Sequence, residues 1–575
     1  MTLHTPGVSE ATEPKEATGR PLRSNLAEGS SRWAVRRAQW TALGLSEEDM
    51  TRPKIAIVNS SSDLAICFSH LDAIVPELKD AIRRAGGVPF EVRTTAPADF
   101  ITSAGRDGRY ILPSRDLVAS DIEVAVEGAL LDGMVCLASC DKTAPGQLMA
   151  AARLDIPTIV VGCGYQPCGR FRDEHVDIEE VFLAAGHVAA GAMPMCDLVG
   201  MSDNAIRGPG VCAGMGTANS MHIACEALGM ALPGSTPVLA NSPQMWDAVR
   251  TAGSRIVAMV EEDLRPRDVL TPEAFENAVT VLLSVSGSVN CIKHLQAVAH
   301  EARCDVDVVD LFDRLADRVP LVCAVRPNGA HFIEDFQAAG GAAATMKRLE
   351  HLLHTDARSV GGGSVGDALT SVAVQDDEVV RPADRPWSRT PSILVVRGSL
   401  APEGAFVKRP VGEETPPRLR GPAVVFPSRD AALEGLREGK VGAGQVAVLR
   451  GLGPRGGPGM ALASAFVFAL EGAGLGDSVA VVTDGQLSGL VNTGIVVGEV
   501  SPEAALPGPL ALVEDGDTVS VDVAARRVDL EVEESVLAER MQRRVEEEAA
   551  ERDYGWLSAY RRLVTPVSKG AVLTE

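Results

Sequence analysis

Short apolar runs alternate with amphipathic segments over residues 54–162, and this alternation restricts the possible folds more than any other feature of the chain. Three of the runs have the length and composition of buried strands, and they lie at 54–61 (KIAIVNSS), 133–139 and 156–162. Segments with helical spacing of apolar residues lie between them, at 71–85, 114–131 and 145–154. Strand and helix in turn predict a parallel, doubly wound α/β sheet, with a ligand crevice at the carboxyl ends of its strands.

The second part of the chain has a different composition. Its short β-branched segments, separated by Gly, Pro and Asp turns, lie at 421–426, 445–450, 478–483 and 518–530. They predict a β-barrel-like domain, and a charged amphipathic helix is expected at 534–552. The charged, proline-containing stretch 376–391 marks the junction. We therefore expect a flexible tail at 1–30, an α/β domain at 31–380 and a β-barrel-like domain with a C-terminal helix at 391–575.

Charge and hydropathy exclude several classes of partner. The formal net charge is −23 and 46% of the 575 residues are hydrophobic, so the chain is acidic and globular. Such a chain would be repelled by a phosphate backbone and by an anionic membrane surface, so nucleic acid is not expected as a partner. The first 30 residues lack the apolar core of a signal peptide, and no stretch approaches the ~18 apolar residues that span a bilayer. We expect a cytoplasmic protein that does not contact the membrane.

Eleven cysteines all lie before residue 324. Most cysteines in such a chain are small apolar core residues, and without an export signal no disulfides are expected. Three of them lie near a glycine, a small residue or a strand end: Cys67 in SSDLAICFSHLD, Cys140 in SCDKTAPGQLMAAARLDIPT and Cys212 in GPGVCAGMGTANSMHIACEALG. Three thiolates from distant loops can hold an iron–sulfur cluster and leave one iron open as a Lewis acid. Three cysteines suit either a 2Fe–2S or a 4Fe–4S cluster.

These stretches form a pattern together with VVTDGQLSGLVNTGIVVGEVSPEAA at 481–505 and GPRGGPGM at 453–460. The pattern resembles the family of dihydroxy-acid dehydratases and sugar-acid (phosphogluconate) dehydratases, from about residue 22 to residue 545. Within that family, LMAAARLDIPTI, LPSRD and PRDVLTPEAFENA are closer to the dihydroxy-acid branch. The resemblance implies the two-domain fold expected above, a homodimer or homotetramer, and an active site between the domains.

The resemblance also implies the roles of individual residues. Cys67, Cys140 and Cys212 would ligate the cluster, and Ser488, in DGQLSG, would be the catalytic base. The implied substrate is a small 2,3-dihydroxy carboxylic acid, which loses water to give an enol and then a 2-keto acid. The hydroxyl at C3 is a poor leaving group, so an open iron must assist its departure. The proton at C2 is weakly acidic, so a base and a cation near the carboxylate are both required.

The chain departs from the family at the magnesium site that the resemblance implies. Of the family's ligands, the Asp and the carbamylated Lys of the CDK motif are retained as Asp141 and Lys142. A third acidic ligand aligns with Arg106, beside which Asp107 is a possible shifted replacement, and a glutamate ligand aligns with Leu462. Because magnesium prefers near-octahedral oxygen ligation, the loss of two anionic ligands argues against a bound ion.

Arg106 and Gln486 are the candidate substrate-binding residues. We hypothesise that Arg106 grips the substrate carboxylate in place of the ion, which leaves Lys142 as an uncarbamylated ammonium or general acid. Gln486 occupies the place of an arginine in the family's DGRFSGG motif, and Glu499 occupies the place of a histidine. The alternative is that Arg106 is a solvated loop residue and that magnesium is retained with the help of the neighbouring carboxylate.

Several alternatives accompany this interpretation. His70 either orients substrate or makes a local hydrogen bond, while Cys163 and Cys168 are interpreted as structural. GPRGGPGM lacks the Lys-Ser/Thr of a phosphate loop, which argues against nucleotide binding. The enzyme could instead be a sugar-acid dehydratase or a specialised-metabolism dehydratase with an altered metal site. A non-catalytic paralogue that keeps the cluster is the alternative of another class, and the retention of Ser488 argues against it.

Overall fold

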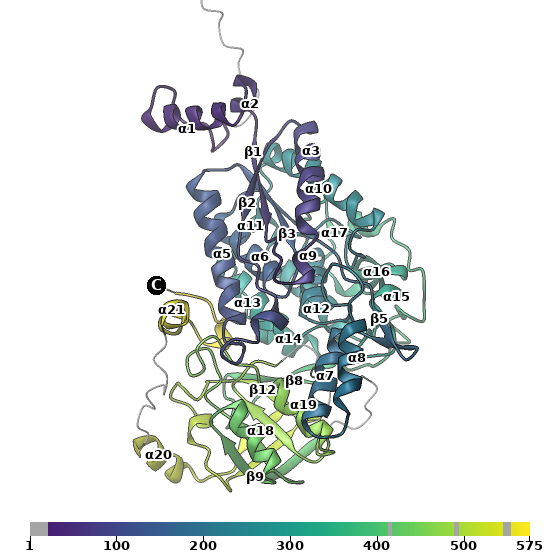
Figure 1. The fold of residues 1–575 in the computed structure, drawn as a ribbon, viewed down its shortest axis with the longest axis vertical. Coiled ribbons are helices and arrows are strands. Elements are labelled where there is room, and N and C mark those ends of the chain that lie inside the picture. The colour runs from purple at the N-terminus through teal and green to yellow at the C-terminus, as the bar shows by residue number, and fades with distance from the viewer. Residues whose placement is uncertain (1–20, 412–416, 488–490, 492–493, 544–553, 575) are drawn as a thin grey trace, which may run out of the picture.

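The computed structural model describes residues 21–411, 417–487, 491, 494–543 and 554–574. Figure 1 shows two regions along the long axis of the molecule: the N-terminal part, drawn purple to teal, and below it most of the C-terminal part, drawn green to yellow. The last α-helix, α21 (Gly555–Leu563), lies beside the first region. Each region is built around its own β-sheet. The order of elements along the chain therefore follows the division into an α/β part and a β-rich part.

The first sheet is parallel throughout and has the strand order β2-β1-β3-β4. Its strands are β1 (Lys54–Asn59), β2 (Val88–Arg93), β3 (Gly133–Ala138) and β4 (Thr158–Gly162). Every residue of β1, β3 and β4 is buried, as is typical of parallel strands that are covered by helices on both faces. The helices nearest to it are α3 (Leu71–Arg84), α5 (Ile111–Gly128), α6 (Thr143–Leu154) and α10 (Pro243–Glu262). The predicted doubly wound α/β fold of this part is confirmed.

Helix α5 begins earlier than the sequence pattern predicts. It starts at Ile111 and ends at Gly128, whereas apolar spacing predicted 114–131. The difference arises at Pro113, which lies in the first turn, where a helix tolerates a residue without an N–H because that group has no partner inside the helix. The shift matters for the site because it places the residues before Ile111 in a turn beside the second domain.

Three further helices fill the centre of the N-terminal part. These are α9 (Thr217–Ala227), α12 (Pro272–Ser284) and α13 (Asn290–Ala302). Helix α9 is buried along its whole length, and α12 and α13 are buried over nearly all of theirs. Helices that are covered on all sides have little freedom to shift, because protein interiors are close-packed. They therefore provide a rigid support for the residues at their N-terminal ends.

The second sheet has eight strands in the order β14-β13-β9-β10-β11-β12-β8-β7. Its strands are β7 (Ile393–Val396), β8 (Gly404–Lys408), β9 (Arg418–Phe426), β10 (Val446–Leu449), β11 (Ala480–Thr483), β12 (Ile495–Ser501), β13 (Thr518–Asp522) and β14 (Arg527–Leu530). Strands β9 to β12 pair in parallel and the outer strands pair antiparallel. A bridge between Arg397 and Arg527 joins the two ends of the sheet, which gives the predicted barrel-like form.

The alternating run at 518–530 forms a hairpin, not one strand. Buried and partly buried residues alternate along β13, and the chain reverses at Val523–Arg526 before β14. Strands β7, β8 and β12 lie outside the segments that the sequence marked as strands. The helix expected at 534–552 begins as α20 (Glu534–Arg543), and the rest of it lies outside the described residues.

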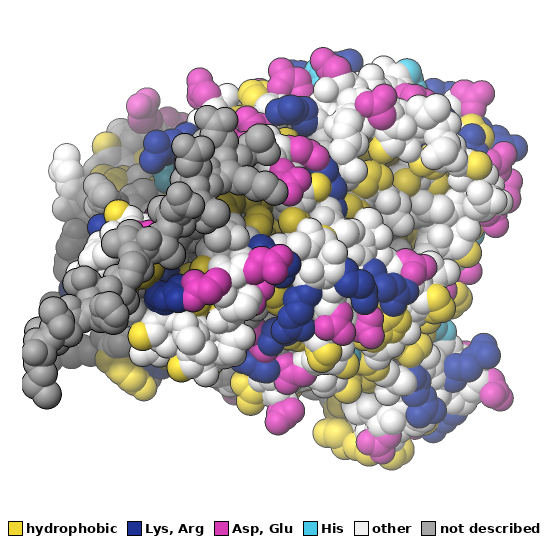
Figure 2. Space-filling view, turned by 90° about the horizontal axis from the view of Figure 1, so that it is seen from above, with side chains coloured by type: hydrophobic (Ala, Val, Ile, Leu, Met, Phe, Trp, Pro, Cys, Tyr) yellow, Lys and Arg dark blue, Asp and Glu magenta, His cyan; other side chains and the backbone are white. Residues whose placement is uncertain are grey.

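The N-terminal segment is attached to the first domain before α1 begins. Ser24 is buried, and its backbone N–H and hydroxyl both donate to the carboxylate of Asp132. Residues 1–20 of the expected tail lie outside the described residues. Within the described part of the chain, no helix has both the length and the apolar character needed to cross a membrane. On the face shown in Figure 2, basic and acidic side chains are interspersed, without a broad area of one sign.

The remaining elements are short strands and helices that cover these two sheets. They are α1 (Ser31–Ala42), α2 (Glu47–Thr51), η1 (Ile66–Phe68), α4 (Asp99–Thr102), η2 (Arg106–Gly108), β5 (Gly169–Phe171), β6 (Glu174–Val176), α7 (Ile178–Ala189), α8 (Met195–Asn204), α11 (Pro266–Val269), α14 (Val308–Leu315), α15 (Ile333–Ala338), α16 (Gly341–Arg348), η3 (Glu350–Leu352), α17 (Val365–Leu369), α18 (Arg429–Arg437), α19 (Ser464–Gly472), η4 (Pro509–Leu512), α21 (Gly555–Leu563) and η5 (Val567–Lys569). Helix α7 packs against α19, so it connects the two domains.

Candidate active site

Three cysteines from three separate loops meet at the carboxyl end of the parallel sheet. Cys67 lies in η1 after β1, Cys140 follows β3, and Cys212 lies in the loop before α9. The thiols of Cys67 and Cys140 are hydrogen-bonded to each other, and the thiol of Cys212 interacts electrostatically with that of Cys67. All eleven cysteines lie in the described part of the chain, and none is in a disulfide. The structure thus brings together the three thiols that the sequence pattern selected.

The surroundings of Cys140 and Cys212 disfavour the charged form of their thiols. The hydrogen bond with Cys67, and then burial, raise the pKa of the Cys140 thiol. Burial, and then the carboxylates of Glu179 and Asp141, raise the pKa of the Cys212 thiol. Thiolates at these positions would therefore need a strong source of positive charge, which a bound metal centre supplies. The donor set of three converging buried thiols fits an iron–sulfur cluster.

A cavity of about 60 Å³ lies beside Cys140 and Cys212, between the two domains. The first domain provides most of its lining, and Leu462 and Gln486 close it from the second domain. Four of the lining side chains are large and apolar: Phe100, Ile111, Phe182 and Leu462. The cavity wall therefore combines polar groups and thiols with an apolar surface.

Lys142 is held in the centre of an acidic pair. It is fully buried, and its Nζ donates to Asp99 Oδ2 at 2.8 Å and lies 4.0 Å from Asp141 Oδ2. Burial alone would lower the pKa of Lys142, but Asp99 and Asp141 more than offset this, so the pKa is raised. Burial, and then the nearby Asp99 carboxylate, raise the pKa of Asp141 to about 7. The raised pKa keeps Lys142 positively charged, and the carboxyl of Asp141 can exchange a proton close to neutral pH.

Four oxygen atoms of cavity-lining residues have unused hydrogen-bonding capacity. Within the described part of the chain, these buried atoms without a hydrogen-bond partner are Asp99 Oδ1, Glu179 Oε2, Asn219 Oδ1 and Gln486 Oε1. Buried polar atoms without partners are rare and costly, so they indicate an absent ligand, ion or water. Oxygen acceptors of this kind can bind the hydroxyl groups of a substrate or a divalent cation.

Gln486 is held in place by the segment that carries Leu462. The backbone N–H of Gln486 donates to Ala461 O at 3.0 Å, and the N–H of Ala463 donates to Gln486 O at 3.0 Å. The sequence-predicted substrate-binding role of Gln486 is compatible with this position on the cavity wall. Ser488, two residues further along, lies outside the described residues.

Arg106 and Asp107 lie in η2 and contact other parts of the chain. The guanidinium of Arg106 lies over the ring of Tyr554, 4.8 Å from its centre. The carboxylate of Asp107 accepts a hydrogen bond from Arg429 Nη2 at 2.7 Å. Among the described residues that line the cavity, neither Arg106 nor Asp107 is found. The ammonium of Lys142, in contrast, contacts Asp99 and Asp141, which both line the cavity.

His70 is a buried residue near the cysteine loops. Its Nε2 is 2.7 Å from the carbonyl oxygen of Cys163, and burial lowers the pKa of its imidazole. The ring is therefore engaged with the backbone of a loop that is distant in the sequence, which differs from the local hydrogen bond considered for it.

Glu499 forms an ion pair that joins the two domains near the cavity. It lies on β12, and its Oε1 is 2.6 Å from Nζ of Lys293 on α13. Lys293 also donates to the side-chain oxygen of Asn290, which lines the cavity. The glutamate at the family's histidine position therefore has a partner of opposite charge, and the pair connects the rigid α13 to the barrel.

Several cavity residues were not among those predicted from the sequence, and Asp99, Glu179 and Asn290 are three of the polar ones. Asp99 lies just beyond the end of β2, and the carboxyl ends of parallel strands are where ligand-binding groups gather, so a signal for it was present. Glu179 and Asn290 lie in the first turns of α7 and α13, and no local pattern distinguishes them from structural residues.

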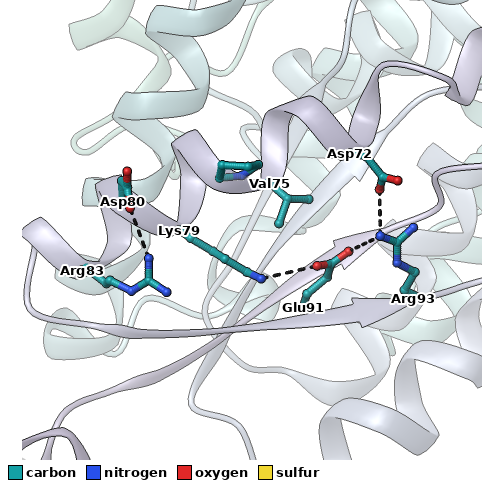
Figure 3. A pocket seen from close by; sticks show the side chains of 8 residues that line it. Asp72, Val75, Lys79, Asp80, Arg83, Glu91 and Arg93 are labelled. Carbon is teal, nitrogen blue, oxygen red and sulfur yellow. Dashed lines mark hydrogen bonds and ion pairs between the residues drawn. The ribbon is translucent and has the colours of Figure 1, made fainter. Parts of the chain in front are cut away.

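A larger groove lies elsewhere on the first domain and differs from the cavity in chemistry. It has a volume of about 410 Å³ and lies between α3 and the edge strand β2. Figure 3 shows that its charged side chains pair with one another, as Lys79 does with Glu91 and Arg93 with Asp72. The groove contains no cysteine, and its charges are already paired. The cavity between the domains is therefore the candidate active site.

Comparisons with known proteins show the family of the chain. The chain matches the family models described as dihydroxy-acid/6-phosphogluconate dehydratase N-terminal, over residues 52–368, and C-terminal, over residues 378–571. It is 41% identical over 559 residues to a dihydroxy-acid dehydratase of Pyrococcus abyssi, covering 96% of this chain and 100% of that protein. It is similar to dihydroxy-acid dehydratases of Acetivibrio thermocellus (39% identical over 554 residues, 96% of this chain and 100% of that protein). The corresponding protein of Aquifex aeolicus is 38% identical over 554 residues, covering 96% of this chain and 99% of that protein.

Proposed function

Because the chain belongs to the dihydroxy-acid/6-phosphogluconate dehydratase family, we propose that it is a hydro-lyase acting on a small 2,3-dihydroxy carboxylic acid. The reaction removes the C2 proton and the C3 hydroxide, and the enol that results tautomerises to a 2-keto acid. The single observation that carries the proposal is the convergence of Cys67, Cys140 and Cys212 beside a cavity lined by Asp99 and Asp141, the two carboxylates that surround Lys142.

The three cysteines would hold an iron–sulfur cluster, of either the 2Fe–2S or the 4Fe–4S type. The cluster supplies a Lewis-acidic iron that favours departure of the C3 hydroxyl. The convergence of three buried or partly buried thiols supports this assignment, since a bound metal centre would convert them to thiolates.

The chain's own residues bind and orient the substrate. Lys142 supplies the positive charge for the substrate carboxylate or acts as the general acid, and Asp99 keeps its ammonium in place. The unpaired oxygens of Asn219 and Gln486 accept hydrogen bonds from substrate hydroxyls. Ser488 is proposed as the base that removes the C2 proton.

The lining of the cavity favours one branch of the family. Phe100, Ile111, Phe182 and Leu462 present apolar surface, which suits a dihydroxy acid with an alkyl substituent. A sugar acid would place hydroxyl groups against these side chains. Those hydroxyl groups would lack hydrogen-bond partners, which would weaken binding. A homodimer or homotetramer and a cytoplasmic location are further expectations, which light scattering and cell fractionation test.

Magnesium binding is the alternative to a free Lys142 ammonium. The carboxylates of Asp99, Asp141 and Glu179 line the cavity and could ligate a divalent cation. That cation would then supply the positive charge for the substrate carboxylate in place of the Lys142 ammonium. The position of Asp107, paired with Arg429, gives the one-residue shift considered above no support.

The substrate class is tested with anaerobically purified enzyme and a panel of alkyl-substituted dihydroxy acids and sugar acids, with keto acid measured as its hydrazone. We expect turnover of the alkyl acids. Cys140→Ser should abolish both the brown colour and turnover, whereas Cys196→Ser, at an exposed thiol, should preserve both. Iron-free wild-type protein, or turnover by the Cys140 variant, would contradict the proposal. Colour without turnover on any acid would support a non-catalytic paralogue.

The roles of the charged residues are separated by a second set of variants. Lys142→Met should lower kcat/KM by about 10²–10⁴-fold, the range typical of acid–base groups. Asp107→Asn should leave it almost unchanged, because that carboxylate lies away from the cavity. Arg106→Ala tests the carboxylate grip directly, since a large rise in KM would restore that hypothesis. Stimulation by added Mg²⁺ with stoichiometric binding would favour the metal-containing site.

A further inference from the structure

A second cluster of metal-binding side chains lies on the hairpin β5–β6. Strand pairing sets Gly169 opposite Val176 and Arg170 opposite His175, with the reversal at Arg172 and Asp173. One step further along the same register places Cys168 opposite Asp177. His175 and Asp177 share a face of their strand because side chains alternate with a period of two. The hairpin therefore gathers a thiol, an imidazole and a carboxylate on one side.

The three side chains are close enough to share one ion. A ligand atom from each of Cys168, His175 and Asp177 lies within 4.8 Å of the other two. Asp177 is buried, and the other two are partly buried. A fourth possible ligand, the carboxylate of Glu334, is adjacent, because its Oε2 lies 3.8 Å from Cys168 Sγ.

Two neighbouring side chains contact Nδ1 of the His175 imidazole, which lies 3.4 Å from Glu180 Oε2 and 3.2 Å from Arg326 Nη1. Metal binding through Nε2 uses the tautomer in which Nδ1–H donates to Glu180, because a guanidinium can only donate. Its Nε2 is buried and, within the described residues, finds no hydrogen-bond partner. Metal-binding histidines commonly contact a carboxylate through one ring nitrogen and bind the ion through the other. The unpartnered nitrogen is thus the one expected to face a metal.

We propose that Cys168, His175 and Asp177 form a binding site for a single zinc-like divalent cation, with Glu334 or water as the fourth ligand. Mixed sulfur, nitrogen and oxygen donors in this number are characteristic of tetrahedral zinc sites. A bound ion would convert the Cys168 thiol to a thiolate, as metal binding requires. The site shares no residue with the three-cysteine site.

The ion would fix the part of α7 that reaches the active-site cavity. Asp177 is the N-cap of α7 and accepts hydrogen bonds from the N–H groups of Glu179 and Glu180. Glu179 and Phe182, on the first two turns of the same helix, line the cavity. Figure 1 shows α7 extending from the neighbourhood of β5 toward the second domain. A cation on the hairpin would therefore hold this connection without taking part in the chemistry.

The test uses anaerobically purified holoenzyme equilibrated with micromolar zinc chloride and then freed of unbound metal. Elemental analysis should give one zinc per chain in the wild type and in Cys196→Ser, an exposed thiol that serves as the matched control. Cys168→Ser and His175→Gln should weaken zinc binding by more than the roughly 10–100-fold typical of outer-shell changes. Iron and sulfide are measured on the same samples, so loss of the cluster is recognised separately.

X-ray absorption at the zinc edge identifies the ligands. We expect one sulfur at about 2.3 Å and nitrogen or oxygen neighbours at about 2.0–2.1 Å. Two or three sulfurs would show zinc at the cluster cysteines and would overturn the proposal. The same conclusion follows if the wild type takes up no zinc, or if both variants, folded by circular dichroism, keep wild-type zinc affinity.

Discussion

Replacing Lys293 by methionine should destabilise the joint between the two domains and make its stability dependent on pH. Lys293 on α13 and Glu499 on β12 are 0% and 1% exposed, and their charged atoms are 2.6 Å apart. Removing the ammonium leaves a carboxylate in a buried site without its partner. Such a carboxylate takes up a proton instead of remaining charged. The free energy of that protonation therefore sets an upper limit on the loss of stability.

The size of the effect follows from the pKa of a free glutamate. Its ordinary value is 4.5, and burial raises the pKa of Glu499 in the folded protein. At pH 7 the carboxyl of the unfolded chain is ionised, so keeping it protonated in the fold costs about 3 kcal/mol, at 1.36 kcal/mol per pH unit. Because the folded pKa is raised, the penalty disappears below the unfolded pKa and grows as pH rises through the interval between the two values. Acidification from pH 7 to pH 6 should therefore return about 1.4 kcal/mol.

Thermal unfolding at a fixed scan rate measures this penalty, since a large protein with a metal centre unfolds irreversibly. For a domain of roughly 190 residues, about 3 kcal/mol corresponds to a fall of about 6–12 °C in the midpoint at pH 7. The double variant Lys293→Met, Glu499→Met should regain most of the loss, because a hydrophobic pair replaces the buried ion pair.

Lys79→Met is the matched control. Its ammonium is 28% exposed and lies 3.4 Å from Glu91, so this pair is expected to contribute about 0–1 kcal/mol. The reasoning is refuted if Lys293→Met lowers the midpoint no more than this control, or if its penalty increases on acidification.

Two further predictions concern single buried positions. Burial lowers the pKa of His222 to about 4, so the neutral ring costs no stability above pH 6.5, and the protein loses stability as pH falls toward the folded pKa. His222→Gln should remove about 2 kcal/mol of the stability loss between pH 7 and pH 5, which unfolding midpoints at the two pH values measure. A Gln at the exposed His300 is the control and should leave that loss unchanged. An alanine at Gly459 (φ +86°) would place its Cβ 1.7 Å from the Arg109 carbonyl oxygen, so it should cost roughly 3 kcal/mol or more in unfolding free energy. An alanine at Gly474, which has a similar φ and open space around it, should cost about 1 kcal/mol, and equal losses at the two glycines would count against a steric role.

The α/β fold and the three thiols were predictable because their signals are local. A buried strand followed by a helix is encoded in a few consecutive residues, and Cys140 follows such a strand directly. Cys67 and Cys212 were selected by motif resemblance, and both lie beside Cys140 in the structure. Strands β7, β8 and β12 were harder to predict, because short apolar segments are ambiguous without their pairing partners.

Only the tertiary structure decided which groups face one another across long separations in the chain. Lys142 is paired with Asp99 of another loop, whereas Arg106, which the alignment brought to a ligand position, lies over Tyr554 near the opposite end of the sequence. The closeness of Cys168 to Asp177 likewise depends on hairpin register. Local backbone preferences and burial patterns determine strands and helices residue by residue, but the meeting of distant side chains depends on how whole elements pack, and no short sequence interval records that.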